Sequence, residues 1–273
     1  RNRPMRNIDV NDVIDNATFT RFHWQVLFWC TLIIIFDGYD LVIYGVVLPL
    51  LMEQWNLSPY VAGLLGSSAL FGMMFGAMGF GMLSDQLGRK KTILMCVVLF
   101  SLTTVINGFA TTPWQFGILR FIAGLGIGGV MPNVVSLMSE YSPQKSRSTL
   151  VALMFSGYAV GGMMSAGLGI WIVPNFGWEI MFYLAVVPLL MLPLIMKFLP
   201  ESVAFLMAQK REGEARSILQ KVAPVRQISE MDTLSVPLTT VSKAPVLELF
   251  RGGRAFSTAM FWIAFFCCLL MVY

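Results

Sequence analysis

Residues 61–91 read VAGLLGSSALFGMMFGAMGFGMLSDQLGRKK, an apolar run that ends in a short polar sequence with three adjacent basic residues. The hydrocarbon core of a bilayer is about 30 Å thick, so a helix that crosses it needs roughly 20 apolar residues. Residues 61–83 meet that length, and Arg89, Lys90 and Lys91 follow closely. The stretch therefore predicts a membrane-spanning helix with a basic loop at one end.

Further apolar runs are spread along the chain. Five of them are long enough to cross a bilayer, and they cover residues 24–51, 92–110, 114–138, 149–173 and 178–199. A last run begins near Ala255 and is still in progress at Tyr273, so we interpret the sequence as a fragment. The sequence is 56% hydrophobic and 12% charged, whereas soluble globular proteins are about 45–50% apolar and about 25% charged. The composition therefore favours an all-α polytopic membrane protein over a water-soluble fold.

Of the 19 Lys and Arg residues, 18 gather on one side of the predicted membrane. They precede the first span, follow the second and fourth spans, and flank or lie in the segment after the sixth, while Arg120 alone lies inside a span. Cytoplasmic loops are enriched in Lys and Arg, so we expect a cytoplasmic N-terminus and a location in the inner membrane of the cell. The net charge of +4 then reflects topology and is not a sign of nucleic-acid binding.

This topology divides the chain into four segments. They are a cytoplasmic tail (1–22), a six-helix bundle (23–199), a cytoplasmic linker (200–254) and the start of a seventh span (255–273). Within the linker, apolar residues recur at helical spacing, which predicts a short amphipathic helix. Its apolar face, which could lie on the bilayer or on the other helices, consists of Ala215, Ile218, Leu219 and Val222.

The polar sequence after the second span, Gly81 to Lys91, resembles the signature loop of the major facilitator superfamily, Gly-x-Leu-x-Asp-x-x-Gly-Arg-Lys. The fold that this resemblance implies is a bundle of two inverted three-helix repeats, joined by the linker to a second bundle, the C-terminal half of the same transporter. Gly88 permits a tight turn, and Asp85 can form an ion pair with Arg89. The resemblance implies that Gly81, Asp85, Gly88 and Arg89 form a conformational latch that holds the two halves when the transporter faces outward.

Two further elements are similar to motifs of sugar porters in the same superfamily. Glu140 and Arg147 match a Glu-x6-Arg pattern in the loop after the fourth span, and Pro200-Glu201-Ser202 follows the sixth span. We assign Glu140 and Arg147 to the same latch.

The fourth span contains a glycine-rich run that begins after Arg120, a residue that itself resembles the superfamily's fourth-helix motif. The run lies inside an apolar helix, with no strand before it and no Lys-Ser/Thr after it, so it does not indicate a phosphate-binding loop. Gly124 and Gly128 share one helix face, where the missing side chains let a neighbouring helix approach closely. We expect the same packing role for the glycines of the fifth span, which are Gly157, Gly161, Gly162, Gly167 and Gly169.

Two acidic residues lie in the first span, within the sequence Asp37-Gly38-Tyr39-Asp40. A charged side chain at mid-bilayer costs roughly 2.5 to 3.5 kcal/mol on insertion scales, so the pair calls for a compensating role. We expect the face that they share to line a central cavity, where a carboxylate takes up a proton in one state and releases it in the other. The alternative is structural: each aspartate caps a helix broken at Gly38 or pairs with Arg120.

The Asp-Gly-x-Asp element, combined with the loop signature, resembles the aromatic acid:proton symporter family over residues 22–202. The resemblance implies proton-driven import of benzoate or hydroxybenzoate-type carboxylates, with Asp37, Asp40 and Arg120 essential. A guanidinium can bind a carboxylate through two parallel hydrogen bonds, so Arg120 is the candidate ligand of the substrate anion. Candidate contacts of the substrate ring are Tyr39, Tyr44, Phe71, Phe75, Phe155 and Tyr158.

Three other functions remain open at this point. They are a sugar porter, a proton symporter for another organic acid, and a membrane sensor that has kept the fold and lost transport. The paired acids of the first span argue against the sugar porter. The sequence shows no catalytic constellation, and its four cysteines lack the spacing of a zinc site. We therefore expect a transporter that is no enzyme and needs no metal, nucleotide or covalent cofactor, with the lipid bilayer, a proton and a small aromatic carboxylate as its partners.

Overall fold

The computed structural model describes residues 7–224, 232–235, 250 and 253–272. The chain divides into two compact units, Arg1–Val236 and Pro237–Tyr273. The first unit contains the helices from α1 (Val10–Asp15) to α10 (Glu212–Val222), and the second contains α12 (Ala255–Val272).

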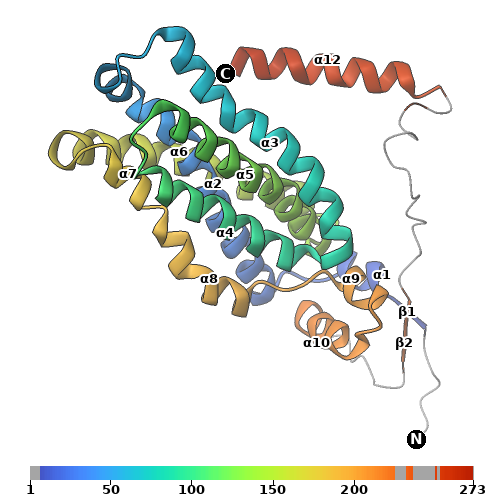
Figure 1. Cartoon of the computed structure of the whole chain (residues 1–273). Helices are drawn as coiled ribbons and strands as arrows, with labels where there is room; N and C mark the ends of the chain where they lie inside the picture. The colour runs from blue at the N-terminus through green and yellow to red at the C-terminus, as the bar shows by residue number, and fades with distance from the viewer. Residues whose placement is uncertain (1–6, 225–231, 236–249, 251–252, 273) are drawn as a thin grey trace, which may run out of the picture. The chain divides into compact units, whose positions relative to one another are not determined.

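In the first unit, the described residues form six spans long and apolar enough to cross a membrane, which confirms the prediction of a polytopic α-helical fold (Figure 1). Helix α12 of the second unit has a shorter apolar stretch, Ala255–Cys268, where the seventh span was expected. The six spans are α2 (Arg21–Gln54), α3 (Pro59–Leu87), α4 (Arg89–Asn107), α5 (Pro113–Tyr141), α6 (Arg147–Phe176) and the pair α7 (Glu179–Tyr183) and α8 (Val186–Phe198).

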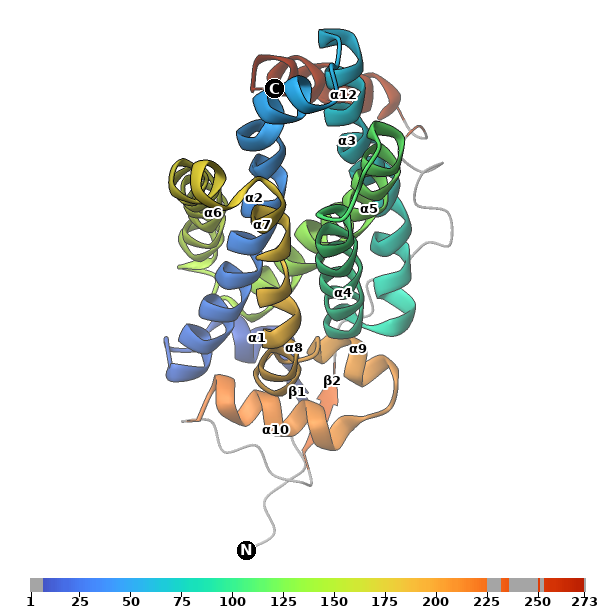
Figure 2. The same cartoon turned by 60° about the vertical axis from the view of Figure 1, so that its left-hand side comes forward.

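The spans pack as two related pairs. Helix α3 packs against α5, and α6 packs against α2; Figure 2 shows the two pairs on opposite sides of the unit. In two three-helix repeats, the first, second and third spans correspond to the fourth, fifth and sixth. The pair of the second and fourth spans (α3 and α5) then corresponds to the pair of the fifth and first spans (α6 and α2), as observed. Because α2 and α5 are the most buried spans, their side chains form much of the interior.

A capping side chain followed by proline marks the start of α3 and of α5. Ser58 caps α3 by accepting a hydrogen bond from the amide of Val61, and Thr112 caps α5 in the same way. Pro59 and Pro113 follow these caps, at the first helical position, where a missing amide hydrogen costs nothing.

The sixth span is interrupted at residues 184–185, between α7 and α8. Pro188 accounts for the break, because proline lacks an amide hydrogen and its ring clashes with the carbonyl group four residues earlier. That carbonyl belongs to Leu184, and it accepts a hydrogen bond from the amide of Val187 instead, at 3.0 Å.

Glycines allow α3 and α5 to touch through their backbones. A Cβ atom added at Gly124 or Gly128 of α5 would collide with a backbone carbonyl oxygen of α3. The converse holds for Gly72 of α3, whose added Cβ would collide with the carbonyl oxygen of Phe121. The predicted packing role of the glycine-rich run is thus confirmed.

The contact between α2 and α6 is equally close. A Cβ atom at Gly38 would collide with the carbonyl oxygen of Tyr158, and one at Gly161 with that of Ile35. Helix α2 continues without interruption through Gly38, so the suggestion of a helix broken there was wrong. The packing role expected of Gly167 was also wrong, because a Cβ atom at that position has nothing within 4 Å.

The N-terminal tail and the first part of the linker lie together at one end of the bundle (Figure 2). Strand β1 (Asn7–Asp9) pairs in parallel with β2 (Thr233–Ser235), and α9 (Val203–Ala208) precedes α10. The amphipathic face predicted for the linker packs on protein, since Ala215, Leu219 and Val222 are fully buried in the main hydrophobic core.

Candidate functional site

Asp40 is the centre of a buried polar cluster that joins three spans. One of its carboxylate oxygens accepts a hydrogen bond from the Thr104 hydroxyl of α4 at 2.7 Å, and the other accepts one from Arg120 Nη1 of α5 at 3.2 Å. Arg120 Nη2 also donates to the backbone carbonyl oxygen of Asp40, at 3.1 Å. Asp40 and Arg120 are each only 1% exposed, so their ion pair lies in the interior of the bundle.

Asp37 lies one helical turn before Asp40 on α2 and has no such support. It is 0% exposed, and within the described part of the chain neither of its carboxylate oxygens has a hydrogen-bond partner. Buried polar atoms almost always find a partner, so an unpaired carboxyl group in a native interior calls for a specific explanation.

We expect the face that Asp37 and Asp40 share to line a central cavity, and in this unit Asp40 borders a cavity while Asp37 is enclosed in the interior. Both lie inside the six-helix unit, and the pairing of Asp40 with Arg120 that we considered as the alternative is what the structure shows. Both terminal nitrogens of Arg120 bind Asp40. In this conformation, therefore, a second carboxylate would have to share the terminal nitrogens of the guanidinium with Asp40.

Asp40 borders a cavity of about 120 Å³. Side chains of α2, α4, α6 and the α7–α8 region form its walls, and nearly all of them are apolar. The lining residues are Ile35, Phe36, Tyr39, Asp40, Phe100, Met164, Leu168, Leu184, Ala185, Val187 and Pro188.

The structure does not bring the six candidate aromatic residues together. Tyr39 borders the cavity, but its hydroxyl donates to the carbonyl oxygen of Met181 at 2.8 Å. The Tyr44 hydroxyl donates to the carbonyl oxygen of Ala62 at 2.6 Å, which ties α2 to α3.

The other aromatic candidates lie on α3 and α6. Phe71 and Phe75 are 58% and 53% exposed on α3, and Phe155 is exposed on α6. Tyr158 is partly buried on α6, where its backbone meets Gly38. Substrate contact by any of these side chains stays a prediction.

The residues of the signature loop form a tight junction between α3 and α4. Gly88 ends α3 and begins α4 with a φ angle of +93°, a conformation that favours glycine. Arg89 Nη2 lies 3.8 Å from an oxygen of Asp85, and Arg89 Nη1 donates to the Ser84 hydroxyl at 3.2 Å. Gly81 has no close neighbour that would exclude a side chain.

Glu140 and Arg147 bind different segments of the chain. One oxygen of Glu140 accepts hydrogen bonds from the Ser202 hydroxyl at 2.7 Å and from the amide of Ala204 at 3.2 Å, at the start of α9. Arg147 pairs with Asp15 at 2.5 Å, at the end of α1. The two residues thus tie the bundle to the linker and to the N-terminal tail.

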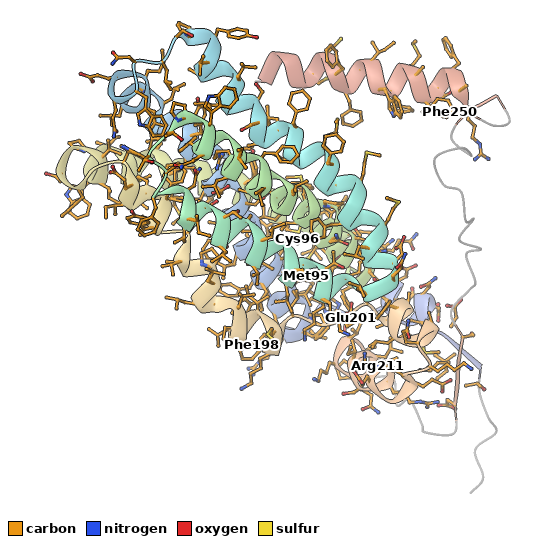
Figure 3. All side chains as sticks on the ribbon, in the orientation of Figure 1. Met95, Cys96, Phe198, Glu201, Arg211 and Phe250 are labelled. Carbon is orange, nitrogen blue, oxygen red and sulfur yellow. The ribbon has the colours of Figure 1, made fainter. Side chains whose placement is uncertain are left out.

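Glu201 was noted in the sequence only as part of a short motif, and the structure gives it a bridging position. One carboxylate oxygen accepts hydrogen bonds from the amides of Lys90 and Ser202, each at 3.0 Å. The side chain therefore lies at the N-terminus of α4, where the helix dipole favours a negative charge; Figure 3 labels Glu201 at this end of the bundle. Its backbone carbonyl accepts a hydrogen bond from the hydroxyl of Tyr141.

Comparisons with known proteins agree with this architecture. A family model described as sugar (and other) transporter matches residues 26–273. The benzoate transport protein of Acinetobacter baylyi is 52% identical over 98% of this chain, and the gallate transporter of Pseudomonas putida is 36% identical over 97%. The 4-hydroxybenzoate transporter PcaK of Pseudomonas putida is 34% identical over 98%. The chain spans 59% of the first of these relatives and 60% of the other two.

Solved structures show the same fold. The partially occluded inward-open conformation of the xylose transporter XylE from E. coli matches with a TM-score of 0.68. That match has 23% sequence identity and covers 74% of this chain and 54% of the XylE chain. A double Trp mutant of XylE matches with the same TM-score at 22% identity, over 76% of this chain and 51% of its own length.

Proposed function

Because this chain belongs to the sugar (and other) transporter family of the major facilitator superfamily, we propose that it is part of a proton-coupled symporter. Its substrates are aromatic carboxylates such as benzoate or hydroxybenzoates. The names of the three relatives support the substrate class, because each describes the transport of an aromatic acid. The proposal involves transport by alternating access and no enzymatic reaction.

The proposed coupling of proton binding to substrate binding depends on the buried ion pair of Asp40 and Arg120. With Asp40 ionised, its carboxylate accepts a hydrogen bond from Arg120 Nη1, while its backbone carbonyl oxygen accepts one from Nη2. A proton on Asp40 removes the negative charge and weakens both the ion pair and its charge-assisted hydrogen bond. The guanidinium then becomes available to the carboxylate of an incoming substrate. The proton and the substrate anion thus bind together. The proton neutralises the carboxylate that competes for Arg120, and the substrate carboxylate gives the buried guanidinium a new anionic partner.

The same competition enforces release. When the proton leaves Asp40, its carboxylate again competes for Arg120, and a buried guanidinium shared by two carboxylates favours departure of the mobile one. Removing one partner of a buried ion pair costs about 3–5 kcal/mol, which is large enough to make the exchange steep. Asp37, one turn away, is the second carboxyl group through which the proton passes.

We place the protein in the inner membrane with its N-terminus in the cytoplasm, which is the side of the basic loops. The junction of α3 and α4, with Gly81, Asp85, Gly88 and Arg89, serves as the conformational latch. Glu140 and Arg147 support it by holding the linker and the tail on the same end of the bundle. The C-terminal half of the transporter completes the substrate site between the two halves.

Uptake measurements on the full-length transporter test this function. Cells that express it should accumulate labelled benzoate or a hydroxybenzoate, and an uncoupler should abolish the accumulation. Unlabelled aromatic acids should compete for uptake, and unlabelled sugars should not. Accumulation that survives the uncoupler would contradict proton coupling, and competition by sugars alone would contradict the substrate class.

A further inference from the structure

In the part of the chain that the structure describes, six of the ten buried side-chain atoms that lack a hydrogen-bond partner belong to the Asp40 cluster or to residues one helical turn from it. Within the described residues they include both carboxylate oxygens of Asp37, the Ser101 hydroxyl, both amide atoms of Asn107, and Nε of Arg120. Arg120 is a member of the cluster. The other three residues each lie three positions from a member along the same helix, Asp37 from Asp40, and Ser101 and Asn107 from Thr104.

Ser101, Thr104 and Asn107 form one polar face of α4. All three are 0% exposed, and residues three apart on a helix share a face. The Thr104 hydroxyl donates to Asp40, so the middle of this face meets α2, and Ser101 and Asn107 lie one helical turn to either side of that contact. The three side chains therefore make a polar file that begins beside the carboxyl groups and ends at the last residue of α4.

The distance from the Asp40 cluster to the α4–α5 connection is short. Thr104 precedes the end of α4 by three residues, which corresponds to about 5 Å along the helix axis at 1.5 Å per residue. Arg120 lies seven residues after the start of α5, or about 10 Å from it. Residues Thr111 and Thr112 of the connection are exposed. Asn107 is thus the polar side chain of this file that lies nearest to that connection.

In the other direction the next buried turns of α2 and α4 are apolar. Ile33 and Ile34 of α2 and Ile93 and Val97 of α4 are fully buried on the side of Asp37 away from Asp40. Cys96, which Figure 3 labels on α4, is buried in the same core. The charged or titratable residues near the file include Asp37, Asp40, Arg120 and Cys96, together with Tyr39 and Tyr44 of α2. Tyr183 lies near its other end, where its hydroxyl donates to the carbonyl oxygen of Gly108 at 3.1 Å. The polar file therefore has one polar end and one apolar end.

We propose that Ser101, Thr104 and Asn107 line a hydrated path along which protons travel from the α4–α5 connection to Asp40 and Asp37. A buried water needs two to four polar partners, and the unpartnered atoms supply both kinds. Asn107 Nδ2, the Ser101 hydroxyl and Arg120 Nε are donors, while the Asp37 oxygens and Asn107 Oδ1 are acceptors. The proton passes along this chain as an excess charge on water and ends on a carboxylate, with no other bond broken.

This path rests on the proposed proton symport, and it deepens that proposal in two respects. It adds Ser101 and Asn107 as positioning residues for the proton. It also makes the side of the α4–α5 connection, opposite the basic loops, the side from which the proton enters in this conformation, while the apolar layer below Asp37 closes the cytoplasmic side.

The substitution Asn107→Leu tests the path, because it removes both polar atoms and keeps the branched shape and the number of side-chain heavy atoms. The full-length transporter is reconstituted in lipid vesicles, and two rates are measured with labelled benzoate. Uptake driven by an imposed pH gradient should fall about tenfold or more, the effect on a rate of losing one hydrogen bond to a charged group. Exchange of benzoate between equal pools should keep its wild-type rate, since exchange requires no net proton movement.

Three further variants separate this role from a structural one. Ser101→Ala, a small change, should slow pH-driven uptake and leave exchange intact, and Asn107→Ser should restore part of the pH-driven uptake. Thr103→Val is the matched control on the same helix, because the Thr103 hydroxyl already donates to the Leu99 carbonyl at 2.7 Å. It should leave both rates unchanged.

Two results would overturn the path. One is a wild-type rate of pH-driven uptake in both Asn107→Leu and Ser101→Ala. The other is an equal loss of exchange and pH-driven uptake in both variants, which would show a general defect in translocation. A wild-type transporter that shows exchange but no pH-driven uptake would refute the proposed symport itself, and the proton path would fall with it.

Discussion

The carboxylate of Asp40 is oriented by a hydroxyl group as well as by its ion pair. Thr104 donates to Oδ1 at 2.7 Å, while Arg120 donates to Oδ2 at 3.2 Å. A hydrogen bond to a charged group contributes about 1.5–3 kcal/mol. The hydroxyl of Thr104 therefore contributes to holding the carboxylate against the guanidinium and to the energy that separates the paired and released states.

The substitution Thr104→Val should weaken this arrangement without changing the shape of the side chain. We expect proton-driven uptake of an aromatic acid to fall about tenfold, because a change of about 1.4 kcal/mol in a barrier is a factor of ten. Thr104→Ser, which keeps the hydroxyl, should retain most of the activity. Initial rates in cells with matched protein levels provide the measurement, and equal rates for the valine variant and the wild type would contradict a role of the hydroxyl.

The sequence predicted the chemistry of this cluster better than its geometry. Two acidic residues and one arginine in apolar spans were conspicuous, and their pairing was one of two alternatives. Thr104 gave no signal, because a single threonine in an apolar span usually bonds only its own helix. Whether Asp40 faces a neighbouring helix or an open surface depends on the rotation of α2 against α4 and α5, which periodicity within one helix does not determine.

At the scale of helices, the close approach of α3 and α5 depends on glycine. A Cβ atom at Gly128 would meet backbone atoms of Met73, including its carbonyl oxygen. Backbone atoms cannot move aside as the end of a side chain can, so Gly128→Ala should push the helices apart. We expect a cost of about 1–3 kcal/mol, seen as a lower midpoint of thermal unfolding in detergent.

Gly167→Ala is the matched control for that substitution. The position lies in α6, inside a span, and an added Cβ atom there has nothing within 4 Å. Alanine also favours a helix over glycine by roughly 0.8–1 kcal/mol, so the thermal midpoint should stay unchanged or rise. An equal loss of stability in both variants would contradict the account of helix contact.

The junction between α4 and α9 gives a second prediction at this scale. Glu201→Ala removes the carboxylate that accepts hydrogen bonds from the amides of Lys90 and Ser202. We expect the start of α9 to open more often, by a free energy of about 1.5–3 kcal/mol, and therefore faster hydrogen exchange over residues 203–208.

Glu214→Ala serves as the control, because Glu214 pairs with Arg211 on an exposed surface. Exposed pairs contribute about 0–1 kcal/mol, so exchange in α9 should hardly change. Unaltered exchange in Glu201→Ala would show that the carboxylate does not hold the junction.

The elements themselves were largely predictable. Runs of about 20 apolar residues gave the six spans, and the amphipathic spacing of Ala215, Leu219 and Val222 gave α10. The break between α7 and α8 was not predicted. Pro188 is a possible signal for it, but a proline alone does not predict a break, because α5 and α6 continue through Pro132 and Pro174.

At the scale of the molecule, the tail, the six-helix bundle and the first part of the linker form a single compact unit. The pairing of β1 with β2 and the ion pair between Asp15 and Arg147 connect segments that are far apart in the sequence. These connections could not be read from the sequence, where the tail and the linker have no shared pattern. If alternating access moves this bundle against the second half, we expect the tail and α10 to move with it.

In the proposed coupling, the proton that accompanies the substrate binds Asp40 and thereby frees Arg120. Substituting asparagine at Asp40 keeps the size of the side chain and removes the titrating group. The variant should insert and still exchange aromatic acid between two pools, because Arg120 no longer has a competing carboxylate.

The most direct test measures proton movement together with substrate movement in vesicles that contain the full-length transporter. Vesicles without protein serve as the control, since an undissociated aromatic acid can cross lipid unaided. Addition of benzoate to wild-type vesicles should make the external solution more alkaline as protons enter with the anion, and Asp40→Asn should exchange benzoate without that change. Proton uptake by Asp40→Asn in the same ratio to benzoate as the wild type would contradict the account.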